Sequence, residues 1–226
     1  VGSEVVEGCP VLSEGRFRSG WFEDFRSRYI PKPNWTVGRD GTFAYGCPAE
    51  YSFSVHRPGA DAVSFQRMYR PYGVVPGELR DFQNVWTVQM NTSGAYEEWK
   101  WTGPQLPDLK PAYGRLILAD GGRTWVWPAR PSGATAAPPD WPLAGLPEII
   151  WSEGKEGAFD VFDVDGRLLG HVRLPERVPF TPYADTPDPV IRGDTVWAVT
   201  VDPDTRANAI ERFRVDWESG PGRQWF

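Results

Sequence analysis

The chain has 226 residues, of which 40% are hydrophobic and 14% aromatic, so it carries enough apolar material for one large all-β domain or two small ones. Its net charge of −6, without a basic stripe, argues against nucleic acid as a partner, and no apolar run approaches the roughly 20 residues of a transmembrane segment. The 24 glycines and 23 prolines follow no collagen-like period and fit a fold of many short strands and turns.

Residues 1–30 are expected to form an N-terminal arm. The only two cysteines, Cys9 and Cys47, both stand in a Gly-Cys-Pro context whose turn-like flanks favour a disulfide over a pair of reduced thiols. Such a bond would tie the arm to the first sheet and would require an oxidising compartment. The chain begins at Val1 without a Met, as a processed product does. We therefore expect a periplasmic or extracellular protein.

An internal repeat organises residues 31–226. Each copy has a proline, a first strand, a turn at Asp-Gly or Gly-Asp, a second strand rich in aromatics, and a further strand or hairpin. The copies begin at Lys32-Pro33, Lys110-Pro111 and Asp188-Pro189. The pattern predicts antiparallel four-stranded sheets centred near residues 34–68, 113–174 and 190–215.

The turns of the repeat predict tight hairpins because their residues tolerate positive φ. They are Asp40-Gly41, Asp120-Gly121, Asp165-Gly166 and Gly193-Asp194. In the segment "VFDVDGRLLGHVRLP" at 161–175, apolar side chains fall on both faces: Phe162 and Val164 on one, Val161 and the preceding Phe159 on the other. A sheet covered on both faces is typical of stacked blades rather than of a sandwich.

Two long inserts interrupt the repeat. Residues 77–103 contain a short helix predicted around 78–90, and residues 129–150 form a loop rich in Pro, Ala and Gly. Tryptophan outside a repeat is a typical interface anchor. The predicted partner-binding residues are Trp86, Trp99, Trp101 and Trp141.

Residues with chemistry of their own are few. His56 and His171 fall on predicted strands without the spacing of metal ligands. Two D-x-D patterns, Asp163/Asp165 and Asp202/Asp204, are explained by hairpin turns better than by calcium loops. We therefore predict no catalytic residue, no metal site and no cofactor.

Several segments resemble the six-bladed β-propellers of the NHL/TolB-like type, which are secreted or periplasmic bacterial proteins. The resemblance covers residues 107–215, through "PDLKPAYGRLILADGGRTWVW", "FDVFDVDGRLLGHVRLP" and "PVIRGDTVWAVTVDPDTRANAIERFRV", and more faintly residues 31–80. It implies a partial, all-β propeller, since the family closes its ring with about six blades and three are counted here. It identifies no activity, and no family active site is carried over.

Three functions remain open. A partial propeller leaves blade faces and strand edges uncovered, which favours binding to other proteins. The first hypothesis is therefore a non-catalytic accessory or scaffold subunit that binds protein subunits of a larger bacterial envelope complex, including membrane complexes. The first alternative is a propeller-type hydrolase or lactonase, which would need a closed ring. The second is a carbohydrate-binding module that uses loop tryptophans.

Overall fold

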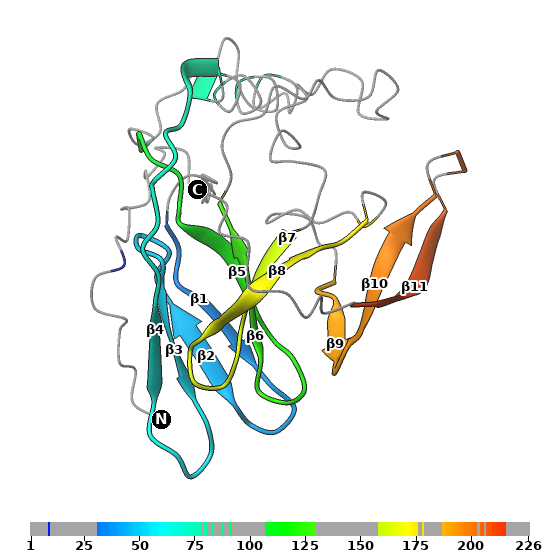
Figure 1. Cartoon of the computed structure of the whole chain (residues 1–226). Coiled ribbons are helices and arrows are strands. Elements are labelled where there is room, and N and C mark those ends of the chain that lie inside the picture. Colours follow the sequence, from blue (N-terminus) through cyan, green and yellow to red (C-terminus); the bar gives the residue numbers. More distant parts are fainter. Residues whose placement is uncertain are drawn as a thin grey trace.

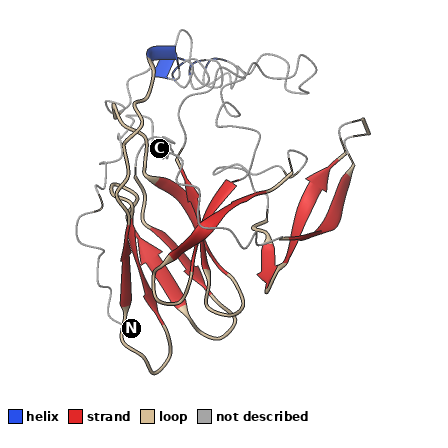
Figure 2. Ribbon diagram, in the orientation of Figure 1, coloured by secondary structure: helices blue, strands red, loops and turns tan. Residues whose placement is uncertain are grey.

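The structure, a computed structural model, describes Cys9, residues 31–77, 107–129, 158–175 and most of 187–215, with a few isolated positions between 79 and 178. Within these residues the chain is nearly all β. Its strands form three antiparallel sheets, and in each sheet the strands pair in the order in which they follow one another along the chain. Figure 2 shows this predominance of strands. The all-β fold class predicted from the sequence is confirmed.

The first sheet contains β1 (Asn34–Val37), β2 (Phe43–Gly46), β3 (Ser52–His56) and β4 (Val63–Gln66). Its first hairpin turns at Gly41, where φ is +82° and a side chain would be strained. The carboxylate of Asp40 accepts a hydrogen bond from the Thr42 backbone amide at 3.0 Å, which holds the turn.

The second sheet contains β5 (Tyr113–Leu118), β6 (Thr124–Pro128), β7 (Ala158–Phe162) and β8 (Leu168–Arg173). The third contains β9 (Val190–Arg192), β10 (Thr195–Val201) and β11 (Asn208–Arg214). Four strands were predicted for the third sheet, and within its described residues that prediction is wrong. Two turns divide the segment, so it supplies three strands, of which the last two are long.

The internal repeat corresponds to the sheets. One proline stands shortly before the first strand of each sheet, at Pro33, Pro111 and Pro189. The glycines of the predicted turns all have positive φ: Gly41, Gly121, Gly166 and Gly193. The repeat and its hairpins are therefore confirmed as three structural units.

The middle sheet lies between the other two (Figure 1) and is packed on both faces. Tyr113, Leu116, Val126 and Phe162 pack against the first sheet. Trp125, Trp127, Phe159, Val161 and Val172 belong to a second core with residues of the third sheet. The prediction of a sheet covered on both sides holds for Phe159, Val161 and Phe162 on β7, which are buried, whereas Leu168 and Leu169 on β8 are exposed. It is wrong for Val164, which is 39% exposed because it lies in the turn after β7.

Strand β1 lies beside β5, and the residues just after β5 lie beside β9. The side chain of Asn34, on β1, donates to the Gly114 carbonyl and accepts from the Leu116 amide at 3.3 Å, both on β5. Just after β5, the Asp120 amide donates to the Ile191 carbonyl on β9 at 3.2 Å. The three sheets are thus joined successively through β1, β5 and β9.

The described positions of the first insert between 77 and 91 are helical, in agreement with the helix predicted around 78–90. The second insert, 129–150, lies outside the described residues apart from Ala129. In the part of the chain that the structure describes, no helix has the length and apolar character to cross a membrane.

Candidate protein-binding faces

The two outer sheets each present one face away from the middle sheet. We call the outward face of β1–β4 the head face. Its outward positions alternate with inward ones such as Ala44, Val55 and Phe65, which are buried against the middle sheet. The head face comprises Trp35, Val37, Phe43, Tyr45, Ser52, Ser54, His56, Ser64 and Gln66. No charged side chain of the Lys, Arg, Asp or Glu type occupies these strand positions.

Aromatic rings cover the centre of the head face. Phe43 and Tyr45 stack with ring centroids 5.7 Å apart, and Tyr45 stacks on His56 at 5.4 Å. Trp35 is 66% exposed and Val37 is 58% exposed, although both lie on a regular strand. Large apolar side chains gathered on one open sheet face are typical of a binding surface.

The outward face of β9–β11, the tail face, is apolar and basic. On β10, Val196 and Ala198 point inward, so their neighbours along the strand point outward. The tail face comprises Val190, Arg192, Thr195, Trp197, Val199, Val201, Asn208, Ile210, Arg212 and Arg214. Ile210 is 78% exposed, and the guanidinium of Arg192 lies 5.9 Å from the centre of the Trp197 ring.

A buried carboxylate, Asp160, joins the first two sheets and was not singled out by the sequence. It lies on β7 and is 2% exposed. Its Oδ2 accepts from the Tyr51 hydroxyl at 2.5 Å and from the Arg67 guanidinium, both contributed by the first sheet and its flanks. Its Oδ1 lies 2.5 Å from Nδ1 of His171, its cross-strand neighbour on β8.

These contacts decide the charge of the cluster. Burial alone would raise the pKa of Asp160, but hydrogen bonds from His171 and Tyr51 and the charge of Arg67 outweigh it and hold that pKa below its ordinary value of 3.8. Burial, followed by the neighbouring carboxylate, raises the pKa of Tyr51, so its hydroxyl remains a donor. Because an ionised carboxylate only accepts hydrogen bonds, Nδ1 of His171 carries the proton.

An Asp–His pair also orients the base of nucleophilic sites, but a nucleophile must then meet the other ring nitrogen. Among the described residues, His171 has no hydrogen bond to a hydroxyl or a thiol, and no group of three or more potential metal ligands occurs. Both oxygens of Asp160 are occupied by donors from two sheets. The cluster is arranged to hold those sheets together.

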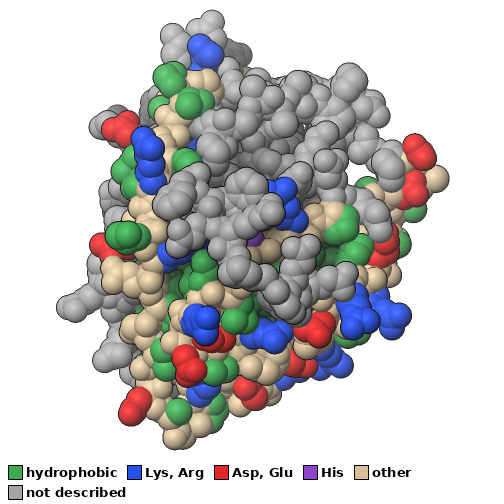
Figure 3. All heavy atoms as spheres, in the orientation of Figure 1, with side chains coloured by type: hydrophobic (Ala, Val, Ile, Leu, Met, Phe, Trp, Pro, Cys, Tyr) green, Lys and Arg blue, Asp and Glu red, His purple; other side chains and the backbone are tan. Residues whose placement is uncertain are grey.

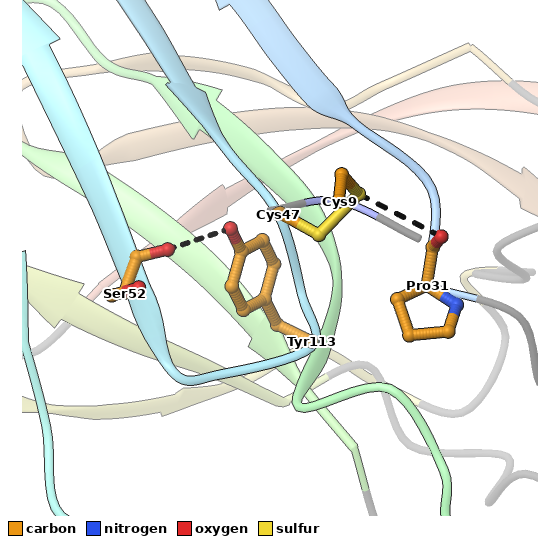
Figure 4. Close-up of a disulfide and its surroundings, with 5 residues drawn as sticks. All are labelled: Cys9, Pro31, Cys47, Ser52 and Tyr113. Atoms are coloured by element: carbon orange, nitrogen blue, oxygen red, sulfur yellow. Dashed lines mark hydrogen bonds between the residues drawn. A yellow bond between two sulfur atoms is a disulfide. The ribbon is translucent and has the colours of Figure 1, made fainter. Parts of the chain in front are cut away.

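A disulfide between Cys9 and Cys47 is present, with Cα atoms 5.3 Å apart (Figure 4). Cys47 directly follows β2, so the bond attaches the N-terminal segment to the first sheet, as predicted. Beside it, the Tyr113 hydroxyl of the middle sheet donates to the Ser52 carbonyl at 2.9 Å. Gly46 leaves room for that ring, since a Cβ there would lie 2.2 Å from the hydroxyl.

The other predicted residues have simple structural roles. His56 belongs to the head face, and His171 to the cluster at Asp160. The D-x-D residues form turns: Asp163 Oδ1 accepts from the amides of Asp165 and Arg167, and Asp202 Oδ1 accepts from those of Asp204 and Thr205. The predicted partner-binding residues lie outside the described residues: Trp86, Trp99, Trp101 and Trp141.

Sequence reasoning missed the head face, although a signal for it exists. The segments Trp35-Thr36-Val37 and Phe43-Ala44-Tyr45 alternate large and small side chains, and the large ones point outward. Arg67 and Asp160 carry no comparable signal, because they are 93 residues apart in the chain.

Figure 3 presents a side of the molecule on which acidic and basic side chains are interspersed over the described residues. That side therefore has no continuous basic stripe of the kind that tracks phosphates.

Comparison of the chain with family models, with curated proteins and with solved structures found no match.

Proposed function

We propose that the chain is a non-catalytic binding subunit whose head face packs against another protein. The observation that carries this proposal is the exposure of Trp35, Val37 and Phe43 on one uncharged sheet face. Burying apolar surface contributes about 25 cal/mol per Å², so covering such a face is favourable. Depletion of charge with enrichment in aromatic residues is also the composition of interface centres.

The arrangement of the rings favours a protein over a sugar as the ligand. A sugar-binding platform needs aromatic faces that are open to the ligand. On the head face, Tyr45 stacks on Phe43 on one side and on His56 on the other, at offset-stacking distances. These three rings thus partly occupy one another's faces and offer edges and apolar bulk, which suit protein side chains.

The partial-propeller reading and the compartment belong to the same proposal. Three successive antiparallel sheets, linked through their first strands, support it, because blades are stacked in this way around an axis. The disulfide supports an oxidising compartment, and we place the protein in the bacterial periplasm or outside the cell. There it would act as a subunit of an envelope complex.

The test is a photo-crosslinker introduced into the full chain in the cells that make it. The amino acid p-benzoylphenylalanine at position 37, on the head face, should give an adduct with another polypeptide after illumination. The matched control is the same amino acid at the exposed position 165, in the β7–β8 turn. Adducts from both positions, or from neither, would contradict the proposal.

A further inference from the structure

We infer that the protein covering the head face is a second copy of this chain, which presents its tail face. This inference rests on the proposed function and names its partner. The head and tail faces are the two ends of a stack of three sheets, and strands β5, β6 and β7 of the middle sheet are already packed on both sides. Within the described residues, each copy therefore has two exposed outer sheet faces, and these differ in composition.

The two faces are complementary. The head face is aromatic and lacks Lys, Arg, Asp and Glu at its strand positions, whereas the tail face carries Arg192, Arg212 and Arg214 among apolar side chains. Arginine is attracted to the negative face of an aromatic ring. The contact of Arg192 with Trp197 within the tail face already has this form.

Pairings of like faces are less suitable. Two tail faces would bring Arg212 and Arg214 of both copies together, and none of the tail-face strand positions supplies an acidic side chain to offset these four charges. Arg192 is already paired with Asp120 at 3.7 Å. Two head faces could bury their rings, but both tail faces would then remain exposed. Pairing head with tail covers both kinds of face with one type of contact.

A head-to-tail contact either closes into a ring or continues as a filament. Three sheets fall below the four to eight blades of closed propellers, whereas two copies supply six, which lies within that range. The expected assembly is therefore a closed pair of chains with two identical interfaces. Its mass would be about 51 kDa, twice the 25.4 kDa of one chain.

Sedimentation velocity of the full, oxidised chain tests this inference. At about 100 µM, well above a Kd of about 1 µM, the wild type should sediment as a pair. Trp35→Glu on the head face and Ile210→Asp on the tail face should each weaken pairing about a thousandfold, to a Kd of about 1 mM, because a pair of one variant carries the change in both of its interfaces, so each variant alone should be mainly monomeric. Both side chains are exposed, so neither change disturbs a core. Leu169→Asp, at an exposed apolar position of the middle sheet, is the control and should pair as the wild type does.

A mixture of the two variants provides the decisive measurement. In a mixed pair, one interface joins the intact head face of the Ile210→Asp chain to the intact tail face of the Trp35→Glu chain, and the other interface carries both changes. Because one interface is then unaltered, mixing should restore pairing that neither variant shows alone. A pair that resists Ile210→Asp but not Trp35→Glu would indicate a head-to-head contact and overturn the inference.

A wild-type monomer at this concentration would also overturn the inference. If position 37 still crosslinked to a different polypeptide, the proposed function would stand and only the partner would be wrong. If it crosslinked to nothing, both would fail.

Discussion

Replacing Asp160 by Asn tests how the first two sheets are held together. The change keeps the size of the side chain and removes its charge. The new amide oxygen can still accept from Tyr51 and Arg67 while the amide nitrogen turns toward His171, whose Nδ1 then has to accept. What disappears is the attraction between the buried carboxylate and the Arg67 guanidinium, together with the charge-assisted character of three hydrogen bonds.

The structure sets the size of the effect. Breaking a fully buried ion pair costs about 3–5 kcal/mol because the remaining charge stays unpaired away from water. The Arg67 side chain is 33% exposed, so part of its charge can be hydrated again. We therefore expect the free energy of unfolding to fall by about 2–3 kcal/mol. For a chain of this length, that corresponds to a decrease in Tm of roughly 5–10 °C.

Urea unfolding at pH 7 followed by tryptophan fluorescence measures this loss. Asp61→Asn, at an exposed loop position, is the control and should change the free energy by no more than about 0.5 kcal/mol. An Asp160→Asn protein with the midpoint of the wild type would refute the conclusion that this carboxylate joins the sheets.

The effect should depend on pH in a defined direction. The pKa of Asp160 in the folded protein lies below 3.8, its ordinary value. The stabilisation is therefore fully present above about pH 4 and is lost as the pH falls through the folded pKa. The stability difference between wild type and Asp160→Asn should therefore shrink as the pH falls from about 5 to below 4. A difference that grew below about pH 4 would contradict the direction of the shift.

Three further results are expected. Gly46→Ala should lower stability by about 1–3 kcal/mol in thermal unfolding, because the new Cβ would lie 2.2 Å from the Tyr113 hydroxyl and 2.7 Å from a backbone carbonyl. The control is Gly77→Ala, which should be neutral or stabilising because nothing lies within 4 Å of the new Cβ. Mass spectrometry of the unreduced protein should find no free thiol, and replacing Cys9 and Cys47 by Ser should cost about 4 kcal/mol for a sequence separation of 38. A far-UV spectrum should show predominantly β structure; a spectrum dominated by helix would contradict the fold.

The sequence by itself determined the features that depend on neighbouring residues. Asp-Gly and Gly-Asp turns require positive φ, and strands flank each of them, so the hairpins and the three repeated units could be predicted from short segments. The apolar side chains on both faces of the segment Phe159–Phe162 also predicted that this strand is packed on both sides. The disulfide was predictable because the chain holds only two cysteines.

The tertiary structure alone decided which faces are open and which charges meet. The alternating pattern of β1 and β2 has large side chains on one face, but only the stacking of the sheets shows that this face points away from the middle sheet. In the sequence, nothing distinguishes Asp160 from other strand residues. Its role depends on Arg67 and Tyr51, which contact it from another sheet. Turn geometry is a property of a few consecutive residues, whereas burial and ion pairing depend on segments that are distant in sequence and adjacent only after the sheets have packed.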